Sequence, residues 1–206
     1  RTMAFNEKFK YKDAFADIYD VWGRRTPSFE VHYQKEVISI LSDYGHGTNK
    51  NSEDKAKVLG AGYEVLIMAF FIGLYSNKML PFEEYADIKD TGQPIQFWGN
   101  LDSKTRRRAY PKLREYMFVA LVARTPDIDW IALDKGKRTV NECVALLMDT
   151  MEQYINYGLS VIREKLQEDE SYFYSKSSFL DIFKELTHPK VKVEKIISDD
   201  IPESLD

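Results

Sequence analysis

The longest apolar run in the chain lies at residues 65–74, where all ten positions are apolar or glycine. Such a run is too short to cross a bilayer, which needs about 20 residues. A helix that is apolar on all sides is typical of the interior of a soluble protein. We therefore predict a buried central helix over about 53–76, with the rest of the chain folded around it.

Apolar positions at three- and four-residue steps predict further helices on both sides of this run. The clearest one begins where Thr139 and Glu142 match a capping box, and it extends to about residue 167. Glycines 60, 62 and 73 are expected to allow neighbouring helices to approach closely. Shorter helices are expected over 12–22, 26–44 and 177–186, from Pro111 onwards, and as one packed turn at 128–133.

Between these helices, residues 77–101 break the helical pattern with prolines and glycines. The segment nevertheless has its own apolar side chains, so we predict a long but ordered loop over 77–101. Two short strands are expected, at 94–98 and, from the alternating pattern, at 191–197. Residues 198–206 form an acidic tail that we expect to be disordered.

Together these patterns predict a mostly α fold, in which residues 1–197 form one bundle of six or seven helices. The length of 206 residues and the 44% hydrophobic content fit a single globular domain. A lone cysteine, Cys143, excludes an internal disulfide and fits a reducing compartment. Its apolar helical setting, ECVALLM, predicts an inert core thiol. With Met3 as the expected natural start and no apolar leader, we expect a cytoplasmic protein without membrane contact.

Charge is distributed unevenly along the chain, although the formal net charge is only −4. Residues 101–138 hold ten Lys or Arg and five Asp or Glu, whereas residues 139–206 hold seven and fourteen. The overall sign argues against a generally basic coat for nucleic acid. Any anionic partner should therefore bind to the middle of the chain.

The densest positive stretch is 104–114, which contains six Lys or Arg and one Tyr. Arginine binds phosphate through paired hydrogen bonds, and aromatic rings between basic residues suit nucleic acid. The alternative is a solvated helix start that pairs with the acidic tail or an acidic partner. The residues expected to bind nucleic acid or a partner are Lys104, Arg106, Arg107, Arg108, Tyr110, Lys112, Arg114, Lys135, Lys137 and Arg138.

Catalytic signatures are lacking in the sequence. It contains no phosphate-binding loop, dinucleotide-binding glycine pattern, paired CxxC, HExxH or GxSxG motif. The three histidines, His32, His46 and His188, fall in different predicted elements, so no metal or cofactor is expected. Glu64, at the entry of the apolar run, is expected to pair with an arginine or lie at the surface, and the alternative is a catalytic acid.

After the apolar run come Gly73-Leu74-Tyr75, a polar step over 76–78, an apolar pair and Pro81. This pattern, over residues 65–82, resembles small helical accessory proteins of bacterial DNA-modification and defence systems, notably Dnd-type phosphorothioation-associated proteins. The resemblance implies a bacterial accessory protein of a DNA-targeting complex without an active site of its own.

Three functional hypotheses follow. The first is a non-enzymatic component of a DNA-associated or anti-phage defence assembly, which contacts nucleic acid or an acidic partner through residues 104–114. The second is a scaffold that forms oligomers or binds other subunits through residues 76–101 and the last helix. The third is a helical enzyme with a carboxylate site built from Glu64 and acidic residues of the loops.

Overall fold

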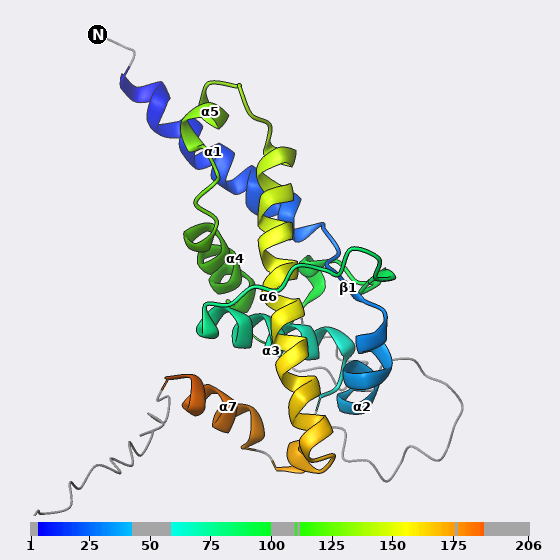
Figure 1. Ribbon diagram of the computed structural model, residues 1–206. Coiled ribbons are helices and arrows are strands. Elements are labelled where there is room, and N and C mark those ends of the chain that lie inside the picture. The colour runs from blue at the N-terminus through cyan, green and yellow to red at the C-terminus, as the bar shows by residue number, and fades with distance from the viewer. Residues whose placement is uncertain (1–3, 43–58, 100–109, 111, 176, 188–206) are drawn as a thin grey trace, which may run out of the picture.

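The computed structural model describes residues 4–42, 59–99, 110, 112–175 and 177–187, with side chains from residue 14 onwards (Figure 1). The mostly helical fold is confirmed, with seven α-helices in this part of the chain. They are α1 (Ala4–Gly23), α2 (Ser39–Leu41), α3 (Gly62–Ser76), α4 (Leu113–Arg124), α5 (Trp130–Asp134), α6 (Val140–Glu168) and α7 (Ser178–Thr187). A two-stranded antiparallel sheet joins β1 (Ser28–Glu30) to β2 (Ile88–Asp90), with Ser28 opposite Asp90.

The long helix α6 forms the axis of the molecule, and α3 lies across it (Figure 1). At the crossing the two backbones touch. A Cβ atom on Gly158 would overlap the carbonyl of Ala69, and one on Gly73 would overlap the carbonyl of Tyr154. Glycine is required at both positions because no side chain fits between the helices. The expected close approach is thus confirmed for Gly73, within a central helix that is buried along most of its length.

The start of α6 follows the predicted capping box. The Glu142 amide donates to the Thr139 hydroxyl at 3.2 Å, and the Thr139 amide donates to the Glu142 carboxylate at 2.6 Å. These bonds satisfy amide groups that have no partner within the helix, which explains why α6 begins at Val140. The Thr139 amide and the Thr139 hydroxyl both donate to the Glu142 carboxylate, and these two bonds lower the pKa of Glu142 because they favour its ionised form.

Aromatic side chains join α1, α4 and α5 into a cluster. The Phe118 ring of α4 lies 5.1 Å from the ring of Phe15 and 5.4 Å from that of Trp22, measured between centroids. Phe15 also lies 6.1 Å from Trp130 of α5. Trp22 and Phe118 are buried, so this cluster extends the core beyond the crossing of α3 and α6. Cys143, near the start of α6, also lies in the core, and burial raises the pKa of its thiol.

The helix predicted over 26–44 is wrong in its first half. Residues 28–30 form β1, because their amides and carbonyls pair with β2 from a distant part of the chain. A helical segment follows, beginning with a π-helix over Gln34–Ile38 and ending with α2. Pairing over such a sequence separation has no signature in a local apolar pattern.

Four other elements also differ from the predictions. The central helix begins at Gly62, since the preceding residue, Ala61, is extended and Leu59 bridges to Ser42. Residues 95–97 form a 3₁₀-helix instead of a strand. Helix α4 begins at Leu113 after Lys112, which has a left-handed φ of 64°, and therefore not at Pro111. The helix expected over 12–22 begins earlier, at Ala4.

The segment 77–99 is anchored at its far end, where Ile95 and Trp98 are buried. Its other large side chains are more exposed: Met79 at 50%, Tyr85 at 90% and Phe97 at 48%. Burial of large apolar side chains thus anchors the loop at its far end, whereas backbone hydrogen bonds hold its start and middle, such as those of Leu80 to Gln153 and of β2 to β1. The predicted strand at 191–197, the acidic tail 198–206, and His46 and His188 lie outside the described residues.

Candidate functional site

Four of the predicted basic residues, Lys104 and Arg106 to Arg108, lie outside the described residues, but the two points that flank them are well defined. The Tyr110 amide donates to the Gly99 carbonyl at 3.0 Å. Gly99 has a φ of +71°, and a Cβ atom there would lie 3.2 Å from the Cβ of Tyr110. Gly99 and Tyr110, which flank residues 100–109 in the sequence, therefore lie next to each other on the body of the protein.

Trp98, which directly precedes Gly99, packs in the core. The Trp98 side chain is 1% exposed, donates through Nε1 to the Gln93 carbonyl at 3.1 Å, and stacks on Tyr63 with ring centroids 5.8 Å apart. Arg114 donates through Nη1 to the Gln96 carbonyl at 2.7 Å. Arg114 is thus a positioning residue that ties α4 to the 3₁₀-helix.

The remaining predicted residues fall into two groups. Lys112, Lys135 and Lys137 are exposed and have room to meet an anionic partner. Arg138 instead donates through Nη1 to the Asp127 carbonyl at 2.7 Å and fastens the turn before α5. Because Arg114 and Arg138 bond to different loops, the described contacts do not unite the predicted set in one patch.

The surface position expected for Glu64 is wrong. Its side chain is buried, at 4% exposed, and Oε2 accepts a hydrogen bond from the Gly60 amide at 3.0 Å. The carboxylate therefore caps the backbone at the start of α3, as acidic groups near helix N-termini do. It pairs with no arginine among the described residues, and its Oε1 atom has no hydrogen-bond partner there.

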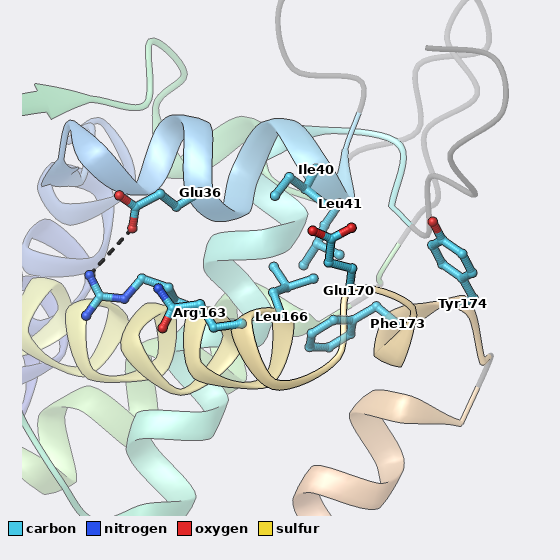
Figure 2. A pocket seen from close by; sticks show the side chains of 9 residues that line it. Glu36, Ile40, Leu41, Arg163, Leu166, Glu170, Phe173 and Tyr174 are labelled. Atoms are coloured by element: carbon cyan, nitrogen blue, oxygen red, sulfur yellow. Dashed lines mark ion pairs between the residues drawn. The ribbon is translucent and has the colours of Figure 1, made fainter.

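A pocket that the sequence did not indicate lies between the helical segment 34–41 and the end of α6 (Figure 2). Its volume is about 430 Å³. We call it the Arg163 pocket. Its polar lining includes Glu36, Arg163 and Glu170, and its apolar lining includes Leu41, Leu166 and Phe173, with Tyr174 at the rim.

Three side chains contact the guanidinium group of Arg163. Its Nη1 atom lies 3.2 Å from Nε2 of His32 and 3.5 Å from Oε2 of Glu36, and its guanidinium lies 5.3 Å from the centre of the Tyr33 ring. His32 in turn places Nδ1 3.5 Å from Oε2 of buried Glu30. Burial raises the pKa of Tyr33 to about 12, although the guanidinium acts in the opposite direction.

Next to this pocket, α6 contacts β1 through polar side chains that we call the polar seam: Glu30, Glu152 and Asn156. The Asn156 amide donates to Glu30 Oε1 and to the carbonyls of Leu80 and Pro81, each at 3.2 Å. Glu30 also accepts from the Glu83 amide at 2.9 Å. Glu152 accepts from the Ser28 amide at 2.8 Å, and burial raises its pKa. The seam fixes β1 and residues 80–83 on α6.

No local pattern would have indicated these polar sites. Glu36 and Arg163 occupy helical positions where charged residues are ordinarily solvated, and their pairing joins residues that are far apart in the sequence. The π-helix that carries Glu36 has no sequence signature either. A polar residue amid the buried face of α6, as Asn156 is, was the one available signal.

Among the described residues, no group of three or more His, Cys, Asp or Glu side chains is arranged to hold a metal ion. None of the helices described is both long and apolar enough to span a membrane. Comparisons with models of protein families, with curated proteins and with solved structures found no match.

Proposed function

We propose that the protein is a non-enzymatic binding component that contacts nucleic acid, or an acidic protein, through the basic stretch 104–110 together with Lys112. The main support for this proposal is the hydrogen bond between Tyr110 and Gly99, the two residues that flank the Arg-rich stretch, because it holds them together next to buried Trp98. A stretch presented from a fixed base loses less freedom on binding than one on a long linker.

The role of each basic residue follows from its contacts. Lys104, Arg106, Arg107, Arg108 and Lys112 are proposed to meet the ligand, with Tyr110 at the base. Arg114 and Arg138 position the backbone instead, because each already donates to a carbonyl at 2.7 Å. Lys135 and Lys137 contribute only long-range attraction. The resemblance over residues 65–82 suggests that the ligand is DNA within a bacterial defence complex.

The test is binding of fluorescently labelled duplex DNA, single-stranded DNA and RNA to the full chain, measured by anisotropy at several salt concentrations. Replacing Arg106, Arg107 and Arg108 by Ala should weaken binding by at least about tenfold at low salt. The slope of log K against log salt should decrease by up to about 0.9 for each duplex phosphate that the variant no longer neutralises.

The control removes three exposed positive charges elsewhere, by replacing Arg24, Lys35 and Lys184 with Ala. It should leave most of the affinity and most of the salt slope intact. If the unaltered chain binds none of the three nucleic acids at low salt, the nucleic-acid version is wrong. Equal losses of affinity in the two triple variants would show non-specific attraction only.

A second candidate function, self-association or subunit binding, is favoured by an apolar groove of about 450 Å³ among α3, α4 and α7. Met68, Phe71 and Phe183 line it together with Tyr75 and Tyr116, whose hydroxyl oxygens lie 3.3 Å apart. Both tyrosines are more than half exposed, which is unusual for aromatic side chains of this size. Sedimentation equilibrium tests this function, since a strict monomer would contradict self-association through the groove.

A further inference from the structure

We propose that the Arg163 pocket binds a small organic cation, an amine carried on an apolar body. Its volume of about 430 Å³ is in the range of small-molecule sites. Leu41, Leu166 and Phe173 form an apolar floor and are each less than a tenth exposed. Burial of apolar surface against that floor supplies the non-specific part of the binding free energy.

The charged side chains that line the pocket favour a ligand of positive charge. Two carboxylates, those of Glu36 and Glu170, line the pocket together with one guanidinium, that of Arg163. The positive charge of Arg163 is already engaged, because His32, Glu36 and the Tyr33 ring surround it. Glu170, by contrast, forms no ion pair or hydrogen bond with any residue in the described part of the chain. A charged group that enters the pocket therefore meets unbalanced negative charge.

Aromatic rings lie on the same side of the pocket as this unpaired carboxylate. Figure 2 shows Phe173 and Tyr174 next to Glu170, at the end away from the Arg163–Glu36 pair. Tyr174 is 56% exposed, so a ligand can reach its ring. The faces of aromatic rings attract cations, and a carboxylate beside them completes the usual environment of a bound ammonium group. An anionic ligand would find no comparable partner at that end.

The backbone of the opposite wall also departs from regular helix. Glu36 belongs to the π-helix Gln34–Ile38, in which the Ser39 amide donates to the Gln34 carbonyl. Single π-turns are rare in proteins as a whole, but those that occur are frequently found at functional sites. Here the π-turn precedes Ile40 and Leu41, which line the pocket with Glu36. The wall thus combines a carboxylate with two apolar side chains.

The experiment compares three probes of one shape: 4-phenylbutylamine, 4-phenylbutanol and 4-phenylbutyrate. Binding to the full chain is measured by saturation-transfer NMR and calorimetry at neutral pH. The amine should bind at least about fivefold more tightly than the alcohol, in line with typical cation–ring and ion-pair effects. The butyrate should bind most weakly.

Two matched variants locate the effect. Glu170→Gln should lower the affinity for the amine to that for the alcohol and leave the alcohol unchanged. Glu168→Gln removes an exposed charge two residues earlier, at a position that does not line the pocket, and should change neither affinity. Equal binding of amine and alcohol, tightest binding of the butyrate, or no saturable binding of any probe would overturn the proposal. So would full amine affinity in Glu170→Gln, or equal losses of affinity in both variants.

Discussion

Opposite sides of α6 are buried in different ways. On one side, Gly158 lets the backbone of α6 touch the Ala69 carbonyl of α3, with no side chain between them. On the other side, Glu152 and Asn156 hold β1 and residues 80–83 through hydrogen bonds. Residues 156 and 158 are only two positions apart, which is about 200° around a helix. One helix therefore makes two kinds of contact. The contact with α3 depends on the close fit of two backbones, and the contact with β1 and residues 80–83 depends on hydrogen-bonding partners.

The difference shows what each contact demands of the rest of the chain. The apolar crossing needs small residues at fixed positions and tolerates no added atom. The polar seam depends instead on matched donors and acceptors, because a buried polar group without a partner is destabilising. We therefore expect substitutions at the crossing to change stability through side-chain volume. Substitutions in the seam should change stability through hydrogen-bonding capacity and its dependence on pH.

The largest effect should come from Gly158→Ala. Its Cβ would overlap the backbone of Ala69, which cannot move aside as a side chain could, so the helices must separate. We expect a loss of about 3 kcal/mol or more in the free energy of unfolding, measured by urea denaturation. Gly23→Ala is the matched control, since a Cβ there meets only the Gln96 Cβ at an ordinary 3.7 Å. Similar losses of stability in both variants would refute the backbone contact.

The next largest effect should come from Asn156→Ala in the polar seam. The change removes one of the two donors to Glu30 Oε1 and the side-chain donor to the Leu80 and Pro81 carbonyls. A loss of about 2 kcal/mol is expected in the same measurement, because these acceptors, which are partly or fully buried, lose a hydrogen bond. Asn141→Ala, at an exposed position of the same helix, should change stability by less than about 0.5 kcal/mol.

A smaller effect is expected at the edge of the seam from Arg163→Met. The variant keeps an unbranched stem of similar width but can no longer bond to His32 and Glu36. Since these side chains are partly exposed, the expected decrease in stability is only about 0.5–1 kcal/mol. A decrease as large as that in Asn156→Ala would mean that Arg163 belongs to the seam itself.

The smallest effect concerns pH. Burial raises the pKa of Glu152 in the folded protein above its ordinary value. The folded state therefore holds this proton more tightly, so the contribution of Glu152 to stability is present below its unfolded pKa and is lost as pH rises through the folded pKa. Glu152→Gln lacks this dependence while its side-chain oxygen can still accept from Ser28.

The stability of the unaltered chain relative to Glu152→Gln should thus increase as the pH is lowered from 7 towards about 4.5, the ordinary pKa of a glutamate. Urea denaturation of both proteins at several pH values measures this difference and cancels the titration of all other groups. A difference that stays constant, or that changes in the opposite direction, would show that Glu152 is as well solvated in the folded protein as in the unfolded chain.

The same contrast explains what the sequence could predict. The apolar run at 65–74, the capping box at Thr139 and the small residue at Gly73 are local signals, and each led to the correct element. The strand β1 and the partners of Glu64 depend on groups that only the folded chain brings together. The helix expected over 26–44 failed for this reason, since β2 competes for the backbone of residues 28–30.

The candidate sites divide in the same way. The Arg-rich stretch is visible as composition, but its closed base and the engagement of Arg114 and Arg138 with carbonyls are not. The Arg163 pocket was not predicted at all, because its lining comes from two segments more than 120 residues apart and from an unforeseen π-helix. The local sequence pattern thus revealed the positively charged stretch, whereas the Arg163 pocket became visible only in the folded structure.

The hydrogen bond between Gly99 and Tyr110 has a consequence for how this protein can vary. For a chain segment whose ends are already joined, each doubling of length adds only about 0.6 kcal/mol of closure entropy. The core therefore places little constraint on how many residues lie between those two anchors, or on which ones. Segments of other length or sequence can be exchanged between Gly99 and Tyr110, by evolution or by grafting, without changing Trp98 or the crossing of α3 and α6.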